Sequence, residues 1–175
     1  MNLLLRASGL IDALNRCVGR LACWLILLAV LISSGNAVAR KTLNMSSNAM
    51  LEIQWYLFAA VFLLCAGYTL LSKEHVRVDL IFSQLSRRKQ LWVEIGGTLL
   101  FLAPMTVLIL VLSWAPFVDA WASGEVSANA GGLIRWPVKL LIPLGFGLLL
   151  LQGLSEIIKD VAELRALRGE QGTVP

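Results

Sequence analysis

The amino-acid sequence predicts an all-α membrane protein with four transmembrane helices and two amphipathic interfacial helices. The first observation is composition: 58% of the 175 residues are hydrophobic, 15% are charged, and the mean hydropathy is +0.76. Soluble domains carry about 25% charged residues, so this chain has too few to cover a soluble surface. The second observation is that the apolar residues gather in four long runs, and the third is that the basic residues lie between those runs.

Each of the four apolar runs is long enough to cross the hydrocarbon core, which requires about 20 residues. The acidic residues within these runs fall close to their ends, where water among the lipid headgroups can solvate a charge. The predicted spans are about 21–39, 52–72, 91–114 and 138–158, in a single membrane domain that covers residues 1–175.

The basic residues indicate how the spans are oriented. If the N-terminus lies in the cytoplasm, eleven of the 15 lysines and arginines fall on the cytoplasmic side and four on the other side. This excess follows the positive-inside rule, so both termini are predicted to be cytoplasmic. The six tryptophans agree with these spans, because all of them fall near span ends, where indole rings favour the membrane interface.

Two further segments are amphipathic but too short to span a membrane. In residues 2–20, apolar side chains follow one helical face, and in residues 76–90 apolar residues at helical spacing precede a basic triplet. Both segments are predicted to lie as helices on the cytoplasmic leaflet. A strand is the alternative for part of the second segment, but an isolated strand leaves backbone groups unpaired. The residues predicted to bind lipid headgroups are Arg77, Arg87, Arg88 and Lys89.

The first span has a second interpretation. The apolar run 21–32, followed by Ala37, Val38 and Ala39, resembles a signal peptide with a cleavage site after Ala39. The amphipathic segment before it is long for a signal peptide, which favours a retained span. Cleavage would remove one span and leave the orientation of the others unchanged.

Few residues have the chemistry that catalysis or cofactor binding requires. The one histidine, His75, excludes a two-histidine haem anchor, and Cys17, Cys23 and Cys65 lack metal-ligand spacing. No Ser/His/Asp set, phosphate-binding glycine loop or zinc motif is present. The net charge of +4 arises between the spans and not on a surface of the nucleic-acid-binding type. The sequence therefore predicts no enzyme activity, no cofactor, no metal and no nucleic-acid partner.

The predicted spans also lack the charged midplane residues that ion-coupled transport uses. Their polar residues, among them Gln152, are of the types that form hydrogen bonds between helices. Glycine allows helix backbones to approach closely, whereas it gains nothing from contact with lipid. At least one of Gly96, Gly97, Gly145 and Gly147 is therefore predicted to lie against another helix.

Three segments carry a resemblance to a known family: EIQWYLF at 52–58, HVRVDL at 75–80 and SANAGGLIRWPVKLLIPLGF at 127–146. With four spans and this chain length, they resemble the small membrane subunit, of the DctQ type, of tripartite ATP-independent periplasmic (TRAP) transporters. The resemblance covers about two-thirds of the chain. It implies uptake of organic acids, often carboxylates such as dicarboxylates, driven by a sodium gradient.

The resemblance further implies a non-catalytic subunit of the bacterial inner membrane that scaffolds a large TRAP permease subunit, in which the substrate and ion sites lie. The predicted partners are that large subunit, a periplasmic substrate-binding protein and membrane lipids. The predicted partner contacts are Glu52, Trp55, Arg135, Trp136 and Gly145. The alternative is a self-associating four-helix structural or signalling protein without a transport role. A quinone-binding anchor of a respiratory enzyme is a weaker alternative, because haem ligands are missing.

Overall fold

The computed structural model describes residues 2–43, 47–73 and 85–171, nearly all of them helical. The elements are α1 (Asn2–Leu43), α2 (Asn48–Leu71), α4 (Arg87–Gly97), the π-helix η1 (Thr98–Leu102), α5 (Ala103–Ser123) and α6 (Trp136–Gln171). Four helical stretches are long and apolar enough to cross a membrane, the third being α4, η1 and α5 taken together. The prediction of an all-α protein with four membrane-spanning helices is confirmed.

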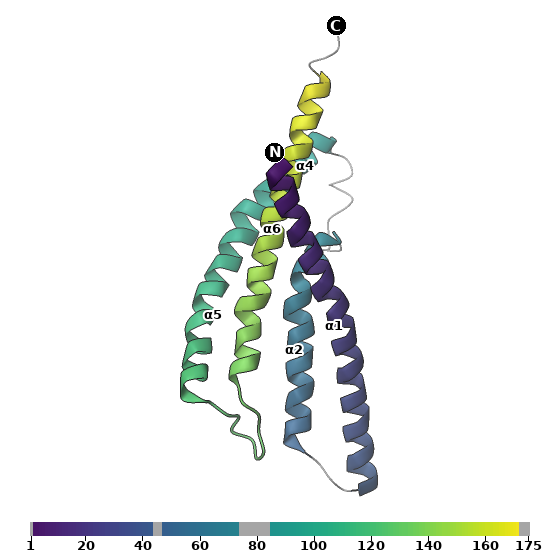
Figure 1. Ribbon diagram of the computed structural model, residues 1–175, viewed down its shortest axis with the longest axis vertical. Coiled ribbons are helices and arrows are strands. Elements are labelled where there is room, and N and C mark those ends of the chain that lie inside the picture. Colours follow the sequence, from purple (N-terminus) through teal and green to yellow (C-terminus); the bar gives the residue numbers. More distant parts are fainter. Residues whose placement is uncertain (1, 44–46, 74–84, 172–175) are drawn as a thin grey trace.

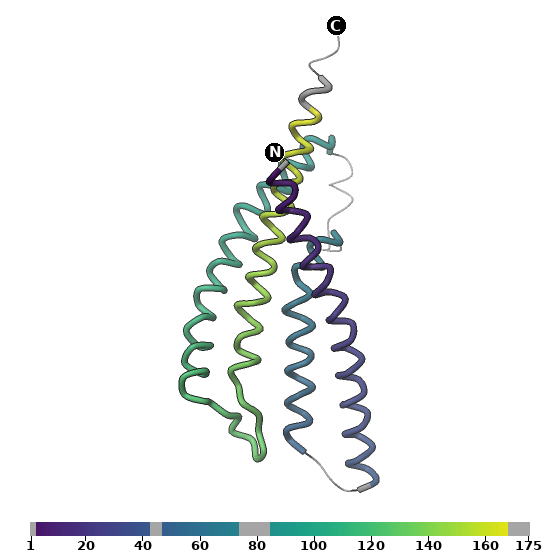
Figure 2. The backbone as a smooth tube through the Cα atoms, in the orientation of Figure 1, coloured from purple at the N-terminus to yellow at the C-terminus, as the bar shows by residue number. Residues whose placement is uncertain are grey.

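The central helix is α6, which packs against α1, α2, α4 and α5. α1 packs against α2 as well, and α5 packs against α6, so that α1 and α5 lie at opposite edges of the bundle (Figure 1). The two termini lie toward one end, here called the terminal end (Figure 2). The connection between α5 and α6, residues 124–135, lies at the opposite end, here called the loop end.

The third span changes its helical geometry just before Pro104. Because proline has no backbone N–H, the carbonyl four residues earlier loses its usual helical partner, and the chain forms the π-helical turn η1 at this point. The Thr106 hydroxyl donates a hydrogen bond to the Leu102 carbonyl at 2.8 Å. α5 ends at Gly124, whose φ of 63° is the left-handed conformation that glycine adopts without steric cost.

The two predicted interfacial helices are not confirmed. Residues 2–20 are helical, but they continue without a break into the first span as the 42-residue helix α1. Ser8 and Asn15 are buried against other helices, whereas Leu3 and Leu10 are exposed. The polar face of this segment therefore packs inside the protein, because α6 offers polar partners for it. Of the segment 76–90, residues 76–84 lie outside the described residues, and 87–90 begin α4.

The described helices bury few large apolar side chains and expose many of them. Trp24, Phe62 and Phe101 are 69%, 73% and 76% exposed, as expected where lipid or a partner helix provides the apolar surroundings. Close helix contact depends on glycine: a Cβ added to Gly145 on α6 would lie 2.6 Å from the Leu63 carbonyl oxygen on α2. The prediction that one of the four glycines lies against another helix is confirmed.

Candidate functional site

Glu52, near the N-terminus of α2, fixes the loop that joins α5 to α6. Its side chain is only 5% exposed and accepts a hydrogen bond from the Ser127 hydroxyl. The Asn129 side-chain amide donates a second bond at 2.8 Å, and the Leu133 backbone N–H donates a third at 2.7 Å. All three donors are neutral, so hydrogen bonds and the positive end of the α2 dipole stabilise this carboxylate.

The same loop is joined to α6 by a second carboxylate. Glu125 accepts a hydrogen bond from the Lys139 ammonium at 2.5 Å and another from the Arg135 guanidinium at 3.2 Å. These two cations, the Lys139 ammonium first, hold the pKa of Glu125 below its ordinary value. The Glu125–Lys139 ion pair also neutralises a charge in an unfavourable position. Lys139 lies in the first turn of α6, where a positive charge opposes the helix dipole.

Aromatic side chains surround this end of the bundle. Trp114, Phe117 and Trp121 follow one another along α5, and Trp121 meets Trp136 of α6 edge to face, with ring centroids 4.5 Å apart. Trp55 on α2 does not join this row and is 71% exposed. The Trp121–Trp136 contact ties the end of α5 to the start of α6, on either side of the loop.

The terminal end is held by a different polar cluster, between α1 and α6. Asp12 accepts hydrogen bonds from the Gln152 amide at 2.9 Å, from the Ser155 hydroxyl at 2.8 Å and from the Lys159 ammonium at 3.1 Å. The cluster continues on both sides of Asp12 along the two helices. Its remaining bonds are Ser8 to Ser155 at 2.7 Å, Asn15 to Gln152 at 2.9 Å, Gln152 to Glu156 at 3.0 Å and Lys159 to Glu156 at 2.6 Å.

The basic residues predicted to bind headgroups fall into three situations. Arg77 lies outside the described residues. Arg87 forms a two-point ion pair with Glu163 of α6, at 2.7 and 2.8 Å, which fastens the start of α4 to α6. Arg88 and Lys89 are exposed on the first turn of α4. Headgroup binding by these residues stays a prediction.

The structure assigns different positions to the predicted partner contacts. Glu52 is buried under the loop, and Gly145 is buried against α2 of the same chain. Trp55 and Arg135 are exposed at the loop end, and Trp136 is partly exposed beside Trp121. Trp55 and part of the α5–α6 loop are exposed there, while Glu52 bonds to that loop.

Sequence reasoning found some members of the polar clusters and missed others. Gln152 forms bonds between helices as its residue type predicted, whereas Thr69, Thr106 and Ser113 bond to carbonyls of their own helices. Asp12 was missed, because it was placed in a surface helix outside the membrane. A signal was present: within 2–20 the polar residues Ser8, Asp12 and Asn15 repeat at helical spacing, which is typical of a buried polar face.

Within the described ranges, no group of three or more histidine, cysteine, aspartate or glutamate side chains has the geometry of a metal site. The middle of each membrane-spanning stretch is uncharged: charges are absent from 21–39, 53–72, 95–118 and 140–155. The two polar clusters therefore lie near the ends of the bundle and do not line a path across it. Both of them connect helices to one another.

This arrangement of four membrane-spanning helices with anchored ends and uncharged middles is that of a multi-pass membrane protein. Residues 29–163 match the family described as tripartite ATP-independent periplasmic transporters, DctQ component, and the chain belongs to this family. It is therefore a small permease subunit of a TRAP transporter, a component that works with a large permease subunit and a substrate-binding protein. No curated protein and no solved structure matches the chain significantly.

Proposed function

We propose that this chain is a non-catalytic scaffold for the large TRAP permease subunit during sodium-coupled uptake of organic acids, with carboxylates as the substrate class. We place it in the bacterial inner membrane with both termini in the cytoplasm. The observation that carries the proposal is the uncharged middle of every span. Translocation of a carboxylate with sodium ions requires charged or exposed polar groups at the midplane, and these must then belong to the large subunit.

The arrangement of the helices supports a scaffold. α1 and α5 lie at opposite edges of the bundle, and each presents a row of large exposed apolar side chains, such as Leu28 and Leu31 on α1 and Leu108 and Leu112 on α5. Such edges can extend the helix packing of a neighbouring subunit in the membrane, because a helix contact there replaces contact with lipid tails. These exposed rows support a role in docking.

The loop end supports a contact outside the membrane. Glu52 and Glu125 bond to the α5–α6 loop, which exposes Val126 and Ile134 at the same end of the bundle as the exposed Trp55. A pre-ordered loop loses little conformational entropy on binding, which favours recognition by a soluble partner. Under this proposal Trp55, Arg135 and Trp136 contact the substrate-binding protein or the outer part of the large subunit.

Reconstitution into proteoliposomes tests the scaffold. Uptake of an organic acid driven by a sodium gradient is expected only when this chain, the large subunit and the substrate-binding protein are all present. Uptake by this chain alone would contradict the proposal. If the chain purified only as copies of itself and uptake did not require it, the alternative of a self-associating protein would hold. Reporter fusions test the orientation: a cytoplasmic signal is expected after Arg168 and a periplasmic signal at Ser123.

A further inference from the structure

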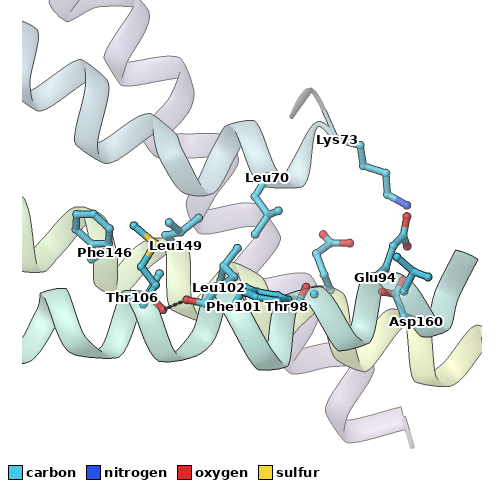
Figure 3. A pocket seen from close by; sticks show the side chains of 14 residues that line it. Leu70, Lys73, Glu94, Thr98, Phe101, Leu102, Thr106, Phe146, Leu149 and Asp160 are labelled. Atoms are coloured by element: carbon cyan, nitrogen blue, oxygen red, sulfur yellow. Dashed lines mark hydrogen bonds between the residues drawn. The ribbon is translucent and has the colours of Figure 1, made fainter. Parts of the chain in front are cut away.

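A groove runs between α2, the third span and α6 toward the terminal end of the bundle (Figure 3). Its volume is about 480 Å³. One wall is built by η1 and the start of α5, and Phe101 and Met105, which are 76% and 61% exposed, lie on its rim. The groove therefore opens on the surface of the bundle, which in a membrane faces lipid or a partner helix.

The groove changes its chemical character along its length. Its deeper part is apolar, with Leu70, Leu102, Phe146 and Leu149 among the lining residues. Toward the terminal end its lining becomes charged, as Figure 3 shows for Lys73, Glu94 and Asp160. Glu156 belongs to the same part of the lining. An apolar trough with a charged mouth is complementary to a molecule that has an apolar chain and a charged head.

Asp160 shows what charge that head carries. This carboxylate is only 5% exposed, lines the groove, and makes no hydrogen bond or ion pair with another described residue. Its neighbour Glu156 is already paired with Lys159, and Glu163 is already paired with Arg87. A buried carboxylate without a partner is costly, so the mouth of the groove favours a ligand that brings a cationic hydrogen-bond donor.

The positions of these residues match the layers of a bilayer. Asp160 lies just beyond the predicted span 138–158, and Lys73 lies just beyond the span 52–72, so both are at headgroup depth. From Asp160 to Phe146 the axis of α6 rises about 21 Å, at 1.5 Å per residue. The charged mouth takes up the first turn of this length, so the apolar part, from Glu156 to Phe146, measures about 15 Å, which is the thickness of one hydrocarbon leaflet.

We propose that this groove is a binding site for a phospholipid with a primary-amine headgroup, such as phosphatidylethanolamine. The ammonium group lies by Asp160, the phosphate lies by Lys73, and one acyl chain lies along Leu102 and Phe146. A primary ammonium donates hydrogen bonds to carboxylates, whereas the quaternary ammonium of phosphatidylcholine has no N–H to donate. Phosphatidylglycerol brings no cation, so the carboxylates repel it.

Native mass spectrometry of the chain in complex with its large permease subunit tests the headgroup. With identical acyl chains, retention of phosphatidylethanolamine is expected to exceed that of phosphatidylcholine by about tenfold, the factor that one charge-assisted hydrogen bond supplies. Asp160→Asn is expected to remove this preference, and Asp119→Asn, an exposed aspartate on α5 outside the groove, is expected to keep it. Equal retention of the two lipids by the wild-type complex would overturn the proposal.

A second pair of variants tests the groove itself. A Cβ added to Gly97 or to Gly96 meets no atom within 4 Å, so both positions accept a side chain, but only Gly97 lines the groove. Gly97→Leu is expected to fill the trough and to lose the retained lipid, while Gly96→Leu is expected to retain it. Loss with both or with neither variant would contradict the assignment. Labelling of the large subunit in place of lipid, by a photo-crosslinker at Met105, would contradict the assignment as well.

Discussion

The two ends of the bundle are both held by carboxylates, but the carboxylates are used in different ways. At the loop end, Glu52 alone accepts three hydrogen bonds, all from neutral donors of one loop. At the terminal end, Asp12 is one member of a cluster that includes Lys159, Glu156 and Gln152. The first arrangement is concentrated on one side chain, and the second is distributed over two helices.

This difference predicts different responses to substitution. When one acceptor holds three bonds, its removal leaves all three donors without that partner at once. In a distributed cluster, removal of one member leaves the others bonded, so the loss is partial. The three bonds of Glu52 are therefore expected to be lost together, and the terminal end is expected to weaken by steps. Between the two ends, α6 contacts α2 at Gly145, and this contact fixes the position of the two helices relative to each other.

The largest effect is expected when a methyl group is added at Gly145, where α6 contacts α2 between the two ends of the bundle. In Gly145→Ala, the new Cβ would lie 2.6 Å from the Leu63 carbonyl oxygen, and backbone cannot move aside as a side chain can. We expect a destabilisation of about 1–3 kcal/mol. The matched variant Gly147→Ala meets only Leu110, at 3.7 Å, and is expected to stabilise by up to about 1 kcal/mol through helix propensity. Thermal unfolding in detergent measures both, and equal stability of the two variants would refute this packing.

The contrast between Gly145 and Asp12 shows which features can be predicted from sequence. The number of spans follows from local properties, namely run length and composition, and the predicted number was correct. The glycine contact followed from residue type as well, but its partner Leu63 did not. The polar contacts of Asp12 and Glu52 join residues more than 70 positions apart, and spacing along the chain carries no information about such pairs.

The lack of information about contacts between distant residues also explains the incorrect prediction for residues 2–20. An apolar stripe on a helix shows that one face prefers lipid, but it does not show what the other face contacts. Here the opposite face meets Gln152 and Ser155 of α6, so the segment extends the first span and does not form a separate surface helix. Glu52, which was predicted to contact a partner, bonds to the α5–α6 loop of its own chain, and a contact with a partner stays a prediction.

At the loop end, Glu52→Gln is expected to release the loop. The amide keeps one acceptor but turns its NH₂ group toward the donors that the carboxylate held, so at least one donor loses its bond. Hydrogen exchange at the Leu133 backbone amide, which Glu52 protects, is expected to accelerate by about tenfold or more. Gln54→Ala, on the same helix, is the control and is expected to leave this rate unchanged. Unchanged protection in Glu52→Gln would show that the loop is held by other contacts.

At the terminal end, Asp12→Ala is expected to have a smaller effect. It removes the acceptor of Gln152, Ser155 and Lys159, but the Asn15–Gln152 and Lys159–Glu156 bonds remain. We expect a loss of about 1–2 kcal/mol, measured by thermal unfolding in detergent. A second substitution, Lys159→Met, in the Asp12→Ala background should cost less than it does alone, since the two residues share a bond. Additive losses would contradict a shared cluster.

The smallest expected effect is a dependence of the loop on pH through Glu125. The Lys139 ammonium, and after it Arg135, lower the pKa of Glu125 in the folded protein below its ordinary value of about 4.3. The folded state therefore binds the proton less readily than the unfolded state does. The stabilising contribution is fully present above about pH 5 and is lost as the pH falls through the lowered pKa.

Because Glu125 is partly exposed, water and salt screen this contribution, and the expected change is small. Protease sensitivity of residues 124–135 should be flat from pH 7 to pH 5 and should rise below about pH 4. Other carboxylates also titrate in this range, so the informative quantity is the difference from Glu125→Gln, which cannot form the ion pairs at any pH. That variant should be more sensitive at pH 7 and should converge with the wild type in acid. Curves that stayed parallel throughout would show that Glu125 does not hold the loop.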